Sequence, residues 1–225
     1  TIGGTQNTTF AELQLNKGAA NQYVTQLRPV FIDSSLILTQ GSLLMNNQTL
    51  TMNNNALSGG TINAPTGPFT RTNGFLISES ASAQVIWKNL NTVGWRNIPF
   101  GNSATAAIPT YIPYSVQLVS FTNPAGLGDF SVSTYYTAGN ALLPPGVTHI
   151  NTTGGANNAA GTVDRFWIVG KTAPNTPSSP IAHLTFRFTN GTTTSLPNEK
   201  LGMPALNIIN PGRAQPWWNL LTNRA

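Results

Sequence analysis

Short runs in which apolar and polar residues alternate dominate the first 80 residues of the chain. Clusters rich in Asn and Gly separate these runs, for example at positions 16–18, 40–41 and 46–47. Alternating apolar positions bounded by Asn and Gly predict short β-strands joined by turns. The predicted strands cover residues 10–15, 30–32, 35–39, 42–45 and 48–52.

The close spacing of these turns carries information about the architecture. Between residues 38 and 50 a turn signal recurs every six or seven positions. This spacing favours the successive sides of a parallel β-solenoid, in which each coil changes direction after a few residues. Asn suits such corners because it tolerates left-handed backbone and hydrogen-bonds locally. A plain meander of hairpins is the alternative.

Longer alternating segments follow at wider spacing. Residues 74–78 and 83–87 are predicted strands, and so are residues 114–121, 129–136, 165–169 and 181–188. Strands separated by long loops rich in Gly, Pro and Asn are typical of an antiparallel sandwich or jelly roll. We therefore predict an all-β chain in two parts. Residues 1–80 form a short β-solenoid or stacked-strand region, and residues 81–225 form a jelly-roll-like antiparallel β-sandwich with an apolar C-terminal tail.

The composition replaces charge with neutral polarity. Only 8% of the residues are charged, against roughly one quarter in a typical soluble domain. The chain instead has 30 Thr and 26 Asn. Its five Trp and ten Phe argue against a disordered chain, and no apolar run is long enough for a membrane helix, so we expect no membrane insertion. The few basic residues are scattered along the sequence and predict no nucleic-acid partner.

Groups able to do chemistry are scarce. The chain has no Cys, six Asp and Glu, and two histidines, His149 and His183, and none of them lies in a known catalytic or phosphate-binding motif. Because catalysis needs titratable groups that converge, we predict a non-enzymatic protein without cofactor or metal site. Asp164 and Arg165 are expected to pair or cap at a strand start. A polysaccharide hydrolase with two facing carboxylates is the alternative.

The aromatic residues fall into two groups. Trp87, Trp95 and Trp167 alternate with apolar strand residues and are expected in the core. Two adjacent pairs, Trp217-Trp218 and Tyr135-Tyr136, are different, because neighbouring strand residues point to opposite faces and one of each pair can be exposed. We take Trp217, Trp218, Tyr135 and Tyr136 as candidate ligand or interface residues. Packing within or between subunits is favoured over stacking on sugar rings.

Three motifs carry a family resemblance. They are LILTQGSLLMNNQTLTM at 36–52, IPFG at 98–101 followed by YIP at 111–113, and VDRFWI at 163–168. In this order they resemble secreted and cell-surface proteins of Bacteroidetes that are substrates of the type IX secretion system. The resemblance covers about residues 30–190 and implies an extracellular protein with a β-helical segment before a β-sandwich. Its motifs are structural and mark no catalytic residue.

These observations predict an extracellular or cell-surface structural or adhesive protein whose partners are copies of itself or other surface proteins. A sharper version is the repeating subunit of a filament or layer, and a carbohydrate-binding module with glycan partners is the alternative. The segment holding Phe10, Leu13 and Leu15 is a candidate for pairing with a neighbour's sheet edge. The other interpretation makes it the first strand of its own domain.

Overall fold

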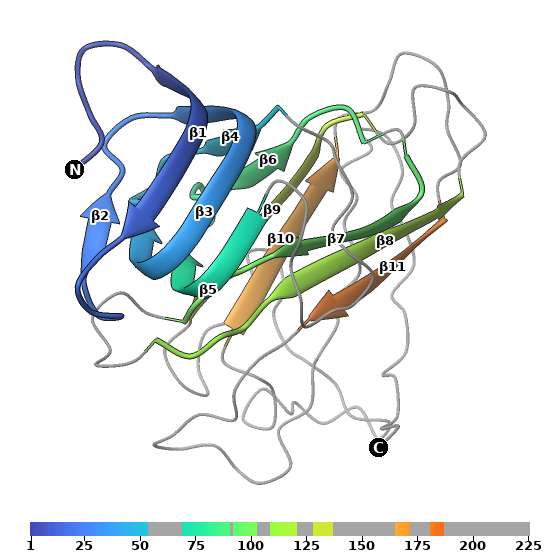
Figure 1. Ribbon diagram of the computed structural model, residues 1–225. Helices are drawn as coiled ribbons and strands as arrows, with labels where there is room; N and C mark the ends of the chain where they lie inside the picture. Colours follow the sequence, from blue (N-terminus) through green and yellow to red (C-terminus); the bar gives the residue numbers. More distant parts are fainter. Residues whose placement is uncertain are drawn as a thin grey trace, which may run out of the picture.

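The described part of the chain folds entirely into β-structure. The computed structural model describes residues 1–53, 69–90, 92–102, 109–120, 128–136, 165–171 and 181–186. These residues contain eleven strands in two sheets and no helix (Figure 1). The predicted all-β class is therefore confirmed. The strands are β1 (Thr8–Asn16), β2 (Tyr23–Thr25), β3 (Val30–Leu44), β4 (Leu50–Met52), β5 (Phe69–Ile77), β6 (Val85–Trp87), β7 (Gly94–Ile98), β8 (Tyr114–Ser120), β9 (Phe130–Tyr136), β10 (Arg165–Lys171) and β11 (Ile181–Phe186).

The first sheet begins as a stack of parallel strands, which we call the parallel stack. Its order is β1-β3-β4-β6-β9-β10, and β2 and β5 also pair with β3. All neighbours from β1 to β6 run parallel, whereas hairpins would have paired them antiparallel. Residues far apart in the sequence are therefore in register: Thr8 pairs with Val30, Val30 with Leu50, and Leu50 with Val85.

Strand β3 turns a corner without breaking. Its first three residues lie between β1 and β4, its middle lies between β1 and β5, and its last residues lie between β2 and β5. One 15-residue strand therefore replaces the three predicted at 30–32, 35–39 and 42–45. The predicted interruption at 40–41 was wrong, because pairing with β5 continues through the corner while the partner on the other side changes from β1 to β2. Gly41 makes the bend with φ of 84°, and it pairs directly with Gly74. Asn46 and Asn47 adopt left-handed backbone, as expected for corner residues.

The chain changes from parallel to antiparallel pairing after β6. Strand β9 pairs antiparallel with β6, and β10 pairs antiparallel with β9. A second, antiparallel sheet has the order β11-β8-β7. Figure 1 shows this sheet alongside β9 and β10. Strand β6 pairs parallel with β4 and antiparallel with β9. The first sheet therefore contains strands from before and after residue 80 without a break. The proposed division there stays a prediction.

One apolar core joins the two sheets. It extends from Leu15 in β1 through the parallel stack to Val132 in β9. Aromatic contacts between the sheets complete it: Tyr114 stacks on Phe130 at 6.2 Å, and Trp167 meets Phe186 edge-on at 5.4 Å. The expected core position of Trp87 is confirmed, because its side chain is fully buried against Phe69; Trp95 and Trp167 are half-buried.

Candidate functional site

The outer edge of β1 ends the parallel stack. Thr8 N donates to Pro29 O at 3.4 Å, so the peptide groups of Thr8 face β3. Because alternate residues of a parallel strand turn to opposite neighbours, the N–H of Thr9 points away from β3. The Thr9 and Ala11 side chains are exposed, and no strand of the described chain lies along this edge. An open edge of this kind is a template for pairing with another strand.

The apolar interior is incompletely covered at this same end, which we call the open end of the stack. Three inward side chains of β1 and β2 are only partly buried, although their register partners in β3 have no exposed surface. The pairs are Phe10 with Ile32, Leu13 with Leu36, and Val24 with Leu43. Solenoid proteins normally close their ends with a capping layer that is polar outside. In this chain Ile2 bridges to Gln26 beside β2, whereas no strand of the described chain covers β1.

The predicted strand-exchange residues are thus placed in this chain's own structure. Phe10 and Leu13 pack against the core, and Leu15 is buried within it. Strand β1 is the first strand of its own sheet, in agreement with the second interpretation of this segment. Its side chains are engaged, whereas its outer backbone groups face away from the stack.

Strand β1 itself carries little charge. Glu12 is the only charged residue of β1 and lies at the middle of the strand. Its carboxylate accepts a hydrogen bond from the Ser35 hydroxyl at 2.6 Å. Edge strands are commonly protected against pairing by Lys, Pro or bulges. Strand β1 has neither Lys nor Pro, and its register with β3 shifts at two places, between Phe10 and Glu12 and between Leu15 and Asn16.

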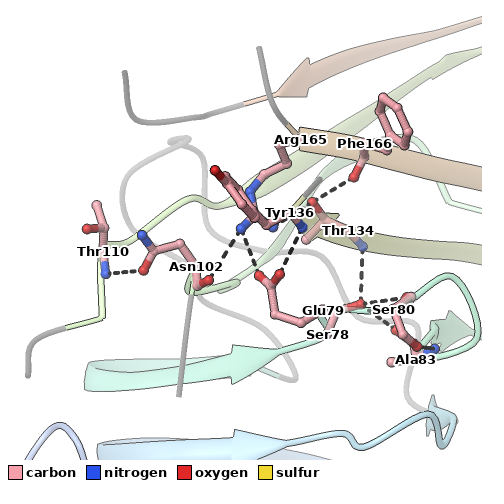
Figure 2. A network of polar contacts seen from close by, with 10 residues as sticks. All are labelled: Ser78, Glu79, Ser80, Ala83, Asn102, Thr110, Thr134, Tyr136, Arg165 and Phe166. Carbon is pink, nitrogen blue, oxygen red and sulfur yellow. Dashed lines mark hydrogen bonds and ion pairs between the residues drawn. The ribbon is translucent and has the colours of Figure 1, made fainter. Parts of the chain in front are cut away.

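At the other end of the same sheet, β10 is anchored by a polar network (Figure 2). Arg165 is 7% exposed, and its Nη2 lies 2.7 Å from Glu79 Oε1. Arg165 also donates to Thr134 Oγ1 at 3.2 Å and to Asn102 O at 3.3 Å. The second Glu79 oxygen accepts from Tyr136 N at 2.8 Å. The network therefore ties the start of β10 to β9 and to the segment after β5.

A second layer of the network surrounds Thr134. Its backbone N–H donates to Ser78 Oγ at 3.1 Å, and its hydroxyl donates to Phe166 O at 2.9 Å. The Ser78 hydroxyl in turn donates to Ala83 O at 2.7 Å. Sequence analysis expected pairing at this strand start, but Asp164 lies outside the described residues. The carboxylate that pairs with Arg165 comes from Glu79, 86 positions earlier, which no local pattern indicates.

The two tyrosines predicted as a ligand or interface pair face opposite sides of the sheet. Tyr135 is partly buried and meets Phe166 edge-on at 5.5 Å, and this burial raises the pKa of its hydroxyl. Tyr136 is 58% exposed at the end of β9. They do not form one aromatic platform. Trp217 and Trp218, the other predicted pair, lie outside the described residues, as does His149.

The described acidic side chains each have a local partner. Asp33 Oδ1 accepts from Asn53 at 2.5 Å, and Asp129 pairs with Lys88 and accepts from Asn89 N at 3.2 Å. His183 is exposed on β11 with its ring 3.2 Å from Gln117 Oε1. Within the described ranges, no three His, Cys, Asp or Glu side chains gather as a metal site. These charges hold strands and loops together.

Besides Arg165, two arginines are partly or fully withdrawn from solvent, which the sequence did not indicate. Arg96 is fully buried beside Trp87 and donates to Thr92 O at 2.9 Å, and this burial lowers its pKa to about 10. Arg71 stacks against the ring of Tyr111 at 4.0 Å and donates to Gly74 O, and burial lowers its pKa as well. Neither of these two cations contributes to a continuous basic face.

Comparisons with known proteins leave the geometry as the main guide. Protein-family models, curated proteins and solved structures give no match to this chain. In the part of the chain that the structure describes, no helix is long and apolar enough to cross a membrane.

Proposed function

We propose that this chain is a non-enzymatic structural protein of the extracellular surface whose copies associate through the open end of the stack. The observation that carries the proposal is the combination found at β1: an edge with one charge and an apolar interior that is only partly covered. Burial of such a surface is favourable and roughly proportional to the apolar area removed from water. The resemblance to Bacteroidetes surface proteins supports the extracellular location.

The proposal includes a finer description of the fold. The parallel stack is a short β-solenoid, and the strands after β6 form a β-sandwich with the second sheet. Support comes from two aligned columns of paired residues that β3 joins at its corner. One column is Thr8, Val30, Leu50 and Val85, and the other is Tyr23, Ser42 and Phe75. A solenoid layer contacts only its neighbours, so the uncovered edge of β1 accepts a further layer.

The test is self-association of the purified chain, measured by sedimentation velocity over a range of concentrations and by electron microscopy. We expect the average mass to rise with concentration. The variant Ala11→Lys, which places a charge on the exposed edge, should shift the association to higher concentration. Ser120→Lys adds the same charge at an exposed position of β8 and serves as the matched control. A chain that stays monomeric throughout would overturn the proposal.

Carbohydrate binding is the second candidate, and the exposure of Tyr136 favours it. This ring is the most exposed large apolar side chain in the described part of the chain, and the Glu79–Arg165 pair holds its backbone. Exposed aromatic rings can stack on sugars. A glycan array would show binding that is lost in Tyr136→Ala and kept in Val119→Ala, a change at another exposed apolar residue. An array without any bound glycan would remove this candidate.

A further inference from the structure

Resting on the proposed self-association, we infer which surface covers the open end: strand β10 of a second copy of this chain. The first sheet has two terminal strands, β1 and β10, and each pairs on one side only within the described residues. Contact between β1 of one copy and β10 of the next is heterologous, or head-to-tail. Such a contact leaves a free β1 and a free β10 at the two ends of every assembly, so it can repeat.

Strand direction supports this pairing. Strand β10 runs antiparallel to β9, and β9 runs antiparallel to β6, so β10 and β6 point the same way. Strand β6 is parallel to β4, β3 and β1. A second copy shifted along the sheet without being turned over therefore places its β10 parallel to β1. This arrangement continues the parallel pairing of the stack. The first sheets of the two copies then turn their core-facing sides in the same direction.

Side-chain chemistry fits the same contact. Strand β10 presents the half-buried Val169 on its core-facing side and the half-buried Ile168 on the other side. Placing Val169 beside Phe10 covers the partly buried Phe10 ring and sets Ile168 beside the exposed Thr9. The charges also suit a head-to-tail contact. The only charged residue of β1 is the acid Glu12, whereas the charged residues of β10 are two bases, Lys171 and the Arg165 that pairs with Glu79.

The symmetric alternative is disfavoured by the position of Glu12. Two copies related by a twofold axis would pair β1 with β1 antiparallel. Because Glu12 is the central residue of β1, full overlap sets the two Glu12 carboxylates directly opposite each other. Like charges facing each other across strands are destabilising. Pairing β1 with β10 avoids this repulsion.

The absence of Cys from the chain allows a direct test by disulfide trapping. The single variants Thr9→Cys and Ile168→Cys are mixed and oxidised, since directly paired strand residues lie within disulfide reach. We expect a disulfide-linked heterodimer in the mixture, and the double variant T9C/I168C should form a ladder of higher oligomers. A mixture of Thr9→Cys with Val119→Cys, whose exposed side chain lies on β8, should give no such heterodimer.

The outcomes separate this inference from the proposed function. Self-association without the T9C–I168C heterodimer would overturn the β10 assignment and leave the proposed function standing. A Thr9→Cys homodimer as the main product would indicate that two β1 strands meet each other and would also overturn it. A monomeric chain would overturn both. Electron microscopy gives an independent readout if Ile168→Cys fails to fold, because six strands along the sheet path predict an axial repeat of about 29 Å.

Discussion

The ion pair between Arg165 and Glu79 is the most consequential polar contact that the structure adds to the sequence. In the variant Glu79→Gln the side chain keeps its size but offers a single acceptor oxygen. Two donors currently use the carboxylate, Arg165 Nη2 at 2.7 Å and Tyr136 N at 2.8 Å. One of them therefore loses its acceptor, and the 7% exposed guanidinium loses its counter-charge.

The expected loss of stability follows from the burial of the two partners. Breaking a fully buried ion pair costs about 3–5 kcal/mol, and an exposed pair contributes about 0–1 kcal/mol. Because the Glu79 side chain is 25% exposed, water replaces part of the lost interaction, and we expect about 2 kcal/mol for Glu79→Gln. In a chain of this size, that corresponds to a fall in Tm of roughly 4–8 °C.

Urea denaturation followed by tryptophan fluorescence measures this change as a shift in midpoint at constant slope. Asp129→Asn is the matched control, since it removes the partner of Lys88, whose side chain is 39% exposed, and it should cost less than about 1 kcal/mol. The double variant E79Q/R165M should be more stable than the sum of its single changes implies, because it leaves no buried charge alone. Equal losses in Glu79→Gln and Asp129→Asn would refute the reasoning.

Two further changes test the corner and the core. Gly41→Ala should destabilise by about 2 kcal/mol in urea denaturation, because φ is 84° and a Cβ would lie 2.8 Å from Gln22 O; Gly18→Ala, whose Cβ meets only Gln22 Oε1 at 3.6 Å, should be near neutral, and equal costs would contradict the strain argument. Burial raises the pKa of Tyr114 above its usual range, so the folded state keeps this phenol protonated. The stability linked to Tyr114 is therefore complete below about pH 10 and is lost as pH rises above it, and Tyr114→Phe should flatten that alkaline loss in urea midpoints measured across pH. An unchanged alkaline slope would show that another group controls it.

Local patterns in the sequence were sufficient to locate most strands. Alternation in residues 114–121 and 129–136 predicted β8 and β9 to within two residues, and the Asn pair at 46–47 correctly marked a corner. Strand β2 was missed, because three residues are too few to show alternation. The continuity of β3 was missed because a corner inside a paired strand has the same Gly signal as a turn between strands.

Long-range features had no local signal. The partner of Arg165 is 86 positions away, and the burial of Arg96 depends on packing against Trp87 rather than on its neighbours in the sequence. The candidate site itself was predicted in part. The segment around Phe10 was identified as an edge candidate from its alternation, but its side chains pack inward and the backbone edge is what remains exposed. That distinction depends on which strand lies beside it.

The short strands at the centre of the first sheet have a mechanical consequence. A load applied between β1 and β10 would pull across the strands, along the direction of the inter-strand hydrogen bonds. The outer ladders, β1 with β3 and β9 with β10, would share that load over eight and seven residue pairs, whereas β3 with β4, β4 with β6 and β6 with β9 have three pairs each. The sheet should therefore yield first at these short ladders between β3 and β9, where Trp87 pairs with Met52 and Phe130 and its buried indole packs against Phe69.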